Sequence, residues 1–149
     1  MQCPSLAEAL RDDDGVPHPA SAPRLDRVRV LVVDDDAEAR DAIRSVLQLS
    51  GANVIDVASA AEALAAMRRA VPDVLLSDIA MPGMDGHELI RRVRALPALQ
   101  GGSVPALALT AYAAPQDRTL ALLSGYQVYL AKPFEAFELV ALVAELAGS

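Results

Sequence analysis

Cysteines, aromatic side chains and long apolar runs are all scarce in this sequence of 149 residues. The single cysteine, Cys3, cannot form an internal disulfide, which fits a reducing compartment. No apolar run approaches the ~20 residues needed to span a bilayer. The N-terminus also lacks the basic stretch, followed by an apolar one, that marks a secretory signal. We therefore expect a soluble, cytoplasmic protein.

Basic residues are also outnumbered by acidic ones. The chain has 13 Lys and Arg against 20 Asp and Glu, which gives a net charge of -7. This balance argues against direct binding to nucleic acid or to an anionic membrane surface. Hydrophobic residues make up 53% of the chain but aromatic residues only 3%, so the core must be built from Ala, Val, Leu and Ile. The length suits one domain with a tail.

The first 26 residues differ in composition from the rest of the chain. They combine scattered prolines with the run Asp12-Asp13-Asp14-Gly15 and show little periodicity. Such a composition is typical of a linker or a disordered arm. We assign residues 1–26 to a flexible N-terminal arm or linker and residues 27–149 to one folded domain.

From residue 28 onward, short apolar runs alternate with amphipathic stretches. The runs at residues 28–33, 53–57, 74–77, 104–109 and 127–131 predict five strands, each followed by a predicted helix. Strands that alternate with helices imply a parallel sheet covered on both faces, with right-handed crossovers. The pattern predicts an α/β, flavodoxin-like (βα)5 three-layer sandwich, with its parallel five-stranded sheet in the order 2-1-3-4-5.

Polar side chains stand where four of the predicted strands end. Asp34 and Asp35 follow the first strand, Asp78 follows the third, Thr110 ends the fourth, and Lys132 follows the fifth. Each of them alone has a commoner explanation as a helix cap, a turn residue or a solvated surface residue. In open α/β sheets, however, ligands bind in the crevice outside the carboxyl ends of the strands. Their joint placement at these ends makes coincidence a poor explanation.

Three neighbouring carboxylates repel one another unless some are protonated or a cation lies among them. Mg²⁺ fits best, because it uses one or two carboxylates, keeps several waters and accepts a phosphate oxygen. The ammonium of Lys132 can balance a transferred phosphoryl group, and Thr110 can donate a hydrogen bond to it. An Asp carboxylate can be the nucleophile that becomes an aspartyl phosphate. Asp36, by contrast, we interpret as the cap of the first helix.

Four segments surround these polar residues. They are Leu31-Val32-Val33-Asp34-Asp35-Asp36, Ser77-Asp78-Ile79-Ala80-Met81-Pro82-Gly83-Met84-Asp85-Gly86, Leu109-Thr110-Ala111-Tyr112 and Tyr129-Leu130-Ala131-Lys132-Pro133-Phe134. The segments closely resemble the receiver domain of bacterial two-component response regulators and hybrid histidine kinases. The resemblance covers residues 28–146, the order and spacing of the segments are highly specific, and no position that the family requires is missing.

The resemblance implies that the domain accepts a phosphoryl group. Asp78 would be the phosphoacceptor, and the donor would be a phosphohistidine on a histidine kinase or a histidine phosphotransfer domain. Asp34 and Asp35 would hold Mg²⁺ together with Asp78 and the backbone carbonyl of Ala80. The domain would thus be a signalling module of a phosphorelay rather than an enzyme, and we expect a monomer or a weak dimer.

The resemblance also implies how phosphorylation would be sensed. Thr110 and Lys132 would contact the phosphoryl oxygens, and Tyr129 would change rotamer as Thr110 moves toward the phosphate. The face formed by the fourth helix, the fifth strand and the last helix would be the switch surface that meets a downstream protein. The peptide bond before Pro133 would be cis, which is uncommon enough to be informative.

Two variable positions predict a long-lived phosphoryl group. Ala80, two residues after the acceptor, has no side chain that could orient a water, and Tyr112, two residues after Thr110, could shield the site. We therefore expect slow self-dephosphorylation.

Two other functions fit parts of the sequence. Asp34-Asp35-Asp36 resembles the Asp-x-Asp motif of haloacid-dehalogenase phosphatases. That family, however, expects Thr or Val at the position of Glu38. It also expects a later acidic pair and usually a cap domain, and this sequence shows neither. The other candidate is a receiver used only as a phosphorylation-independent binding module, and the intact site argues against it. Because no DNA-binding domain follows Leu146 and the proline-rich arm resembles a kinase linker, we expect the C-terminal receiver of a hybrid histidine kinase, or otherwise a stand-alone regulator.

Overall fold

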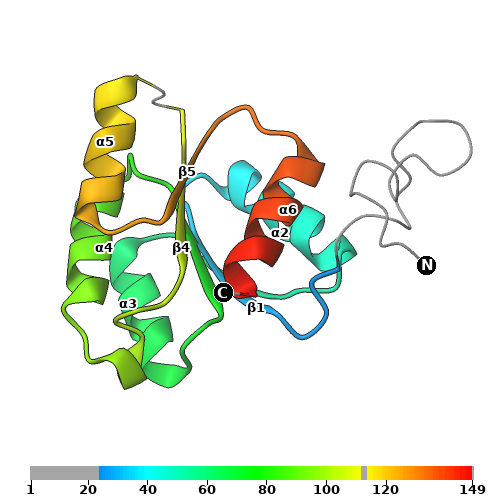
Figure 1. Cartoon of the computed structure of the whole chain (residues 1–149), viewed down its shortest axis with the longest axis horizontal. Helices are drawn as coiled ribbons and strands as arrows, with labels where there is room; N and C mark the ends of the chain where they lie inside the picture. Colours follow the sequence, from blue (N-terminus) through cyan, green and yellow to red (C-terminus); the bar gives the residue numbers. More distant parts are fainter. Residues whose placement is uncertain (1–23, 112–113, 149) are drawn as a thin grey trace, which may run out of the picture.

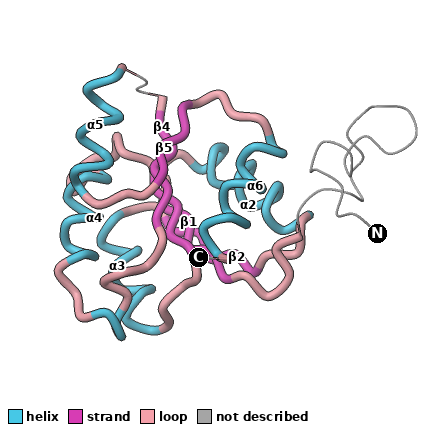
Figure 2. The backbone as a smooth tube through the Cα atoms, in the orientation of Figure 1, coloured by secondary structure: helices cyan, strands magenta, loops and turns pink. Residues whose placement is uncertain are grey.

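One parallel sheet lies at the centre of the fold. The computed structural model describes residues 24–111 and 114–148. Its five strands run in the order β2-β1-β3-β4-β5, and helices cover both faces of the sheet (Figures 1 and 2). The predicted flavodoxin-like fold and its strand order are confirmed. None of the helices in these two ranges has the length and hydropathy that a membrane crossing requires.

Every predicted strand and helix is present. The strands are β1 (Arg29–Val33), β2 (Asn53–Val57), β3 (Val74–Ser77), β4 (Ala106–Thr110) and β5 (Val128–Ala131). The helices are α2 (Ala37–Leu49), α3 (Ala60–Arg69), α4 (Gly86–Arg94), α5 (Pro115–Ser124) and α6 (Ala136–Ala147). A short 3-10 helix, η2 (Ala98–Gln100), lies in a stretch that we predicted as a loop.

Side-chain caps start three of these helices. Asp36 caps α2 by accepting a hydrogen bond from the backbone of Glu38, as predicted, and Asp85 caps α4 in the same manner. Ser59 caps α3, and the carboxylate of Glu62 accepts a hydrogen bond from the N–H of Ala58 at 2.9 Å. Such caps satisfy backbone donors that the first helical turn leaves unpaired. The helices that follow β1, β2 and β3 therefore begin where the local sequence predicts.

The sheet separates two apolar layers. The helices α3, α4 and α5 pack on one face, and α2 and α6 pack on the other (Figures 1 and 2). All residues of β3 and β4 are buried, which explains why their sequences are continuous apolar runs rather than alternating patterns. Each fully buried Leu, Ile or Val contributes about 1.5–3 kcal/mol by leaving water. The largest buried side chains come from both layers and include Ile43, Leu47, Leu75, Leu89, Ile90 and Leu139.

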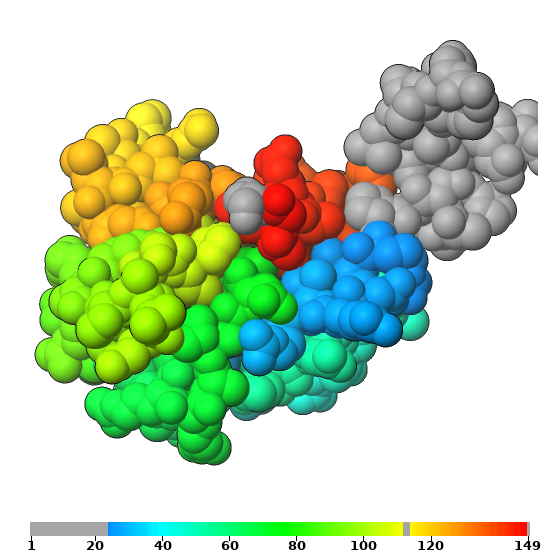
Figure 3. All heavy atoms as spheres, turned by 60° about the horizontal axis from the view of Figure 1, so that its bottom comes forward, coloured from blue at the N-terminus to red at the C-terminus, as the bar shows by residue number. Residues whose placement is uncertain are grey.

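Residues 24–26, the described end of the predicted arm, pack against the domain. The side chain of Leu25 is 0% exposed and lies in the apolar layer under α2 and α6. Its N–H donates to the carbonyl of Ser50 at 2.7 Å. In the space-filling view, the blue start of the described chain lies beside red α6 (Figure 3). Leu25 is therefore part of the packed domain, whereas residues 1–23 lie outside the described residues.

Candidate functional site

The ends of β1 and β3 bring three aspartates together. Asp34 and Asp35 directly follow β1, and Asp78 directly follows β3. The two strands pair in parallel with Val33 opposite Ser77, so the residues that follow them are neighbours. The N–H of Asp78 donates to the carbonyl of Val33 at 2.8 Å. One carboxylate oxygen from each of the three aspartates lies within 4.8 Å of the others.

Main-chain hydrogen bonds orient two of these carboxylates. Asp34 is 1% exposed and Asp78 is 9% exposed, whereas Asp35 is exposed. One oxygen of Asp34 accepts a hydrogen bond from the N–H of Asp36 at 2.9 Å. One oxygen of Asp78 accepts a hydrogen bond from the N–H of Ile79 at 2.7 Å. The two buried carboxylates are thus held in place by the turns that follow their own strands.

The ammonium group of Lys132, the residue that follows the edge strand β5, also lies at this cluster. The strands β4 and β5 pair with Thr110 opposite Ala131, and the N–H of Lys132 donates to the carbonyl of Thr110 at 2.8 Å. The ammonium of Lys132 lies 3.1 Å from a carboxylate oxygen of Asp34 and 3.7 Å from one of Asp78. The structure therefore places all the residues predicted at the strand ends on one edge of the sheet.

Burial raises the pKa of the Asp78 carboxyl above its ordinary value of 3.8. The Lys132 ammonium lowers this pKa, the Asp34 carboxylate raises it, and the N–H groups of Ile79 and Ala80 lower it. The cluster holds three carboxylates and one ammonium, so it has an excess of negative charge. A cation among the carboxylates would relieve this repulsion and favour the ionised form of Asp78.

The donor atoms of the cluster suit a hard divalent cation. They are all oxygens, and Mg²⁺ is bound by oxygen ligands at about 2.0–2.1 Å in an octahedron, which places opposite ligands about 4 Å apart. One oxygen of each aspartate lies within 4.8 Å of the others, so the three oxygens are near enough to share one ion. Small side-chain rotations, or a water in place of one direct contact, would fit Mg²⁺ to Asp34, Asp35 and Asp78.

Residues 30–144 match the family of the response regulator receiver domain. The chain belongs to this family. A Leptolyngbya boryana protein, named as the uncharacterized 14.6 kDa protein in the sodA1 3' region, is 50% identical over 119 residues, which are 80% of this chain and 89% of that protein. The DNA-binding response regulator MtrA of Mycobacterium tuberculosis H37Rv is 39% identical over 117 residues, which are 78% of this chain. The chain spans only 49% of the length of MtrA.

A solved receiver domain with the same fold contains a magnesium ion. It is the receiver domain of sensor histidine kinase PA1611 from Pseudomonas aeruginosa PAO1, solved with a magnesium ion coordinated in the active-site cleft. The two structures align with a TM-score of 0.76 and 34% sequence identity, over 83% of this chain and 99% of the other. That receiver domain thus binds Mg²⁺ in its active-site cleft, and this chain has an acidic cluster at the carboxyl ends of its strands.

Four predicted residues remain to be placed: Tyr129, Pro133, Ala80 and Tyr112. Tyr129 is on β5, and its buried hydroxyl has no hydrogen-bond partner within residues 24–111 and 114–148. Burial, together with the nearby charge of Asp117, raises the pKa of Tyr129. The peptide bond before Pro133, which we expected to be cis, is cis. Ala80 is exposed, and Tyr112 lies outside the described residues.

Sequence reasoning missed two buried hydroxyl groups near Asp78. The hydroxyl of Ser77 donates to the carbonyl of Asp78 at 2.8 Å. The hydroxyl of Tyr126 donates to the carbonyl of Gly86, the first residue of α4, at 2.9 Å. Tyr126 is 3% exposed, and burial raises its pKa. The one available signal was an aromatic residue just before a strand in a chain with few aromatics.

Proposed function

We propose that this receiver domain is the phosphoacceptor of a bacterial two-component phosphorelay, with Asp78 as the residue that is phosphorylated. The donor is a phosphohistidine on a histidine kinase or a histidine phosphotransfer domain. One observation carries the proposal: Asp78 shares a cluster with Asp34 and Asp35, and the Lys132 ammonium lies 3.7 Å from its carboxylate. This arrangement supplies a nucleophile together with the charges that a phosphoryl group needs.

The proposed transfer exchanges one bond to phosphorus for another. A carboxylate oxygen of Asp78 attacks the phosphorus in line with the P–N bond of the phosphohistidine. As the new O–P bond forms, the imidazole leaves with the P–N electron pair and takes a proton from water. The acyl phosphate is later lost by hydrolysis, which returns the Asp78 carboxylate and inorganic phosphate.

Residues around Asp78 position and neutralise the phosphoryl group. Asp34, Asp35 and Asp78, with the backbone carbonyl of Ala80, would hold Mg²⁺, which supplies positive charge to the phosphoryl oxygens when bound. Lys132, which lies 3.1 Å from Asp34 in this structure, balances a further phosphoryl oxygen as a point charge. The hydroxyl of Thr110 donates a hydrogen bond to the same group.

The switch surface is the face formed by α5, β5 and α6. As Thr110 moves toward the phosphoryl group, Tyr129 changes rotamer. The buried hydroxyl of Tyr129 has no hydrogen-bond partner among the described residues. This supports the step, because an unpaired buried hydroxyl costs free energy that another rotamer can recover. Leu120 on α5 is 47% exposed and Phe137 on α6 is 37% exposed. These apolar side chains offer contact area to a downstream protein.

Hydrolysis of the acyl phosphate should be slow. Ala80 is exposed beside the acceptor but has only a methyl side chain, which cannot orient an attacking water. Ala80→Asn places an amide there and should speed the loss of phosphate, which can be followed by intact mass after the phosphodonor is removed. An unchanged lifetime in this variant would argue against a role for position 80.

Labelling with a small phosphodonor tests the proposal. Incubation with acetyl phosphate and Mg²⁺ should add one phosphoryl group, and peptide mapping should place it on Asp78. Asp78→Asn should abolish labelling. Asp36→Asn should keep it, because Asn caps a helix about as well as Asp and position 36 is not assigned to the metal. Label on Asp34 instead of Asp78 would favour the phosphatase alternative, and persistent labelling of Asp78→Asn would refute the proposal.

Two further expectations remain predictions. The first is origin in a hybrid histidine kinase. The similar proteins include both the receiver of a sensor kinase and a DNA-binding regulator, so this expectation rests on the sequence alone. The monomeric or weakly dimeric state is likewise a prediction, which sedimentation of the phosphorylated and unphosphorylated protein would test.

A further inference from the structure

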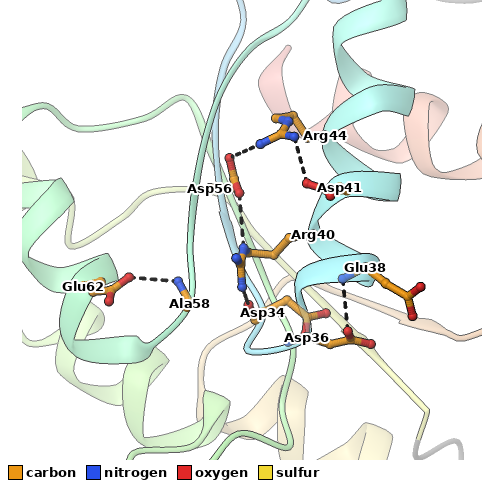
Figure 4. Close-up of polar contacts among 9 residues, drawn as sticks. All are labelled: Asp34, Asp36, Glu38, Arg40, Asp41, Arg44, Asp56, Ala58 and Glu62. Carbon is orange, nitrogen blue, oxygen red and sulfur yellow. Dashed lines mark hydrogen bonds and ion pairs between the residues drawn. The ribbon is translucent and has the colours of Figure 1, made fainter.

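A side chain of α2 is bonded to the turn that carries two of the metal-site aspartates. The guanidinium of Arg40 donates through Nη1 to the backbone carbonyl of Asp34 at 2.9 Å (Figure 4). Asp34 is 1% exposed, so its carbonyl has little access to water. The turn between β1 and α2 is thus held from the helix that follows it.

The same guanidinium is anchored on the edge strand β2. Its Nε donates to a carboxylate oxygen of Asp56 at 3.2 Å. The other oxygen of Asp56 accepts a hydrogen bond from Arg44 at 3.0 Å, and Arg44 also pairs with Asp41 at 2.8 Å (Figure 4). The Arg40 and Asp56 side chains are only 20% and 18% exposed. Charge-assisted bonds that are this well shielded are stronger than those of a surface ion pair.

Both backbone polar groups of Asp34 are therefore tied to β2. Its N–H donates directly to the carbonyl of Val57 on β2 at 3.2 Å, and its carbonyl is tied to Asp56 through Arg40. The peptide plane that holds this carbonyl also contains the Cα atoms of Asp34 and Asp35. A fixed carbonyl thus restrains the backbone from which the two aspartate side chains leave, and so narrows the range of positions that their carboxylates can take.

We propose that Arg40 is a positioning residue for the metal site, which sets the geometry of Asp34 and Asp35 through the Asp34 carbonyl. The inference rests on the proposed function, because it assigns Mg²⁺ to these carboxylates. Arg40 does not touch the metal or the phosphoryl group. It acts as an outer partner of metal ligands, and loss of such partners typically weakens metal affinity.

If Arg40 acted on the metal site only through its charge, its removal would change the Mg²⁺ affinity in the opposite direction. A guanidinium near a cation site repels the cation, so its removal would tighten Mg²⁺ binding if charge dominated. Arg44 provides a matched control, because it pairs with the same Asp56 carboxylate and carries the same charge. Within the described part of the chain, its side chain bonds to Asp56 and Asp41 and not to Asp34.

Titration of the full-length protein with MgCl₂ alone tests the inference. By calorimetry, Arg40→Met should weaken Mg²⁺ affinity roughly tenfold, whereas Arg44→Met should stay within about twofold of wild type. Acetyl phosphate labelling of Arg40→Met should need more Mg²⁺ for half-maximal rate but reach the wild-type rate at saturation. Arg40→Lys should also bind weakly, because one ammonium does not reproduce the planar fork of the guanidinium.

Each outcome is decisive. Wild-type or tighter affinity in Arg40→Met, or an equal loss in Arg44→Met, overturns the inference and leaves the proposed function intact. Absence of Mg²⁺ binding by the wild-type protein removes the proposed metal site itself, and the inference with it. If Arg40→Met does not fold by circular dichroism, Asp56→Ala replaces it, because that change removes the acceptor of the Arg40 Nε bond and keeps Arg40. Unchanged Mg²⁺ affinity in a folded Asp56→Ala protein would equally refute the inference.

Discussion

Asp78 shows how distant residues set the chemistry of one side chain. Its pKa is raised by burial, lowered by Lys132 from the end of β5 and raised by Asp34 from the end of β1. These partners are far apart in the sequence and meet only at the edge of the sheet. In the absence of a cation, the ionised carboxylate is therefore less favourable in the folded protein than in the unfolded chain.

This raised pKa predicts a pH-dependent effect on stability. Because the folded state binds the Asp78 proton more tightly, the contribution of this group to stability falls as pH rises from about 3.8 through the folded pKa. Asp78→Asn should thus raise the unfolding temperature at pH 7 in a chelating buffer, and the gain should disappear below pH 3.8. Thermal melts followed by circular dichroism across this pH range measure the effect.

Added Mg²⁺ provides the control for that prediction. The wild-type protein should gain stability from Mg²⁺ by mass action, and Asp78→Asn should gain less because one proposed ligand has lost its charge. A lower unfolding temperature for Asp78→Asn than for wild type, at pH 7 without metal, would contradict the predicted stabilisation.

At the scale of elements, α4 packs directly on the backbone that follows β3. The N–H of Gly86 donates to the carbonyl of Ile79 at 2.8 Å, and its own carbonyl accepts the bond from Tyr126. A Cβ at position 86 would lie 2.5 Å from the carbonyl oxygen of Asp78 and 2.7 Å from the Cα of Ile79. The absence of a side chain lets α4 approach the residues around the proposed acceptor.

Gly86→Ala should therefore destabilise the domain and disturb the site. The added methyl meets backbone atoms that cannot rotate away, so we expect a loss of about 1–3 kcal/mol in the free energy of unfolding, together with slower labelling by acetyl phosphate. Urea denaturation measures the first effect and intact mass the second. Gly148→Ala is the control, because its nearest contact would be an ordinary 3.5 Å. Equal stability of the two variants would argue against the close approach of α4.

The elements that the sequence predicted correctly share a local cause. Asp36, Ser59 and Asp85 each bond to a backbone N–H within three residues, so these helix starts depend on neighbours in the chain. The short helix η2 was missed, since three residues after Pro97 contain no period to recognise. Strand positions were predictable because a run of apolar residues signals burial on both faces of the sheet.

At the scale of the whole molecule, the apolar layer under α2 and α6 extends to the first described residues. Leu25 is 0% exposed and packs with residues from the middle and the end of the chain. A single apolar residue between Arg24 and Asp26 has no periodicity, so its burial could not be foreseen. The segment before β1 thus helps to close the core.

Leu25→Ala should lower the free energy of unfolding by about 2–5 kcal/mol, because it leaves a cavity in a closed layer. Leu49→Ala is the matched control: Leu49 is 82% exposed, so its truncation should change stability by no more than about 0.5 kcal/mol. Urea unfolding of both variants measures the difference. Similar small effects for the two leucines would show that residue 25 does not belong to the core.

The pair Leu25 and Leu49 also marks the limit of what the residue pattern can reveal. Period, caps and turn residues are properties of neighbours along the chain, so they were enough to predict the strands, the helices and the aspartates at the strand ends. The bond from Arg40 to the carbonyl of Asp34, its anchor on Asp56, and the opposite burial of two identical leucines required the folded chain. The physical reason is that burial and side-chain reach depend on distances in space, which separation along the chain does not specify.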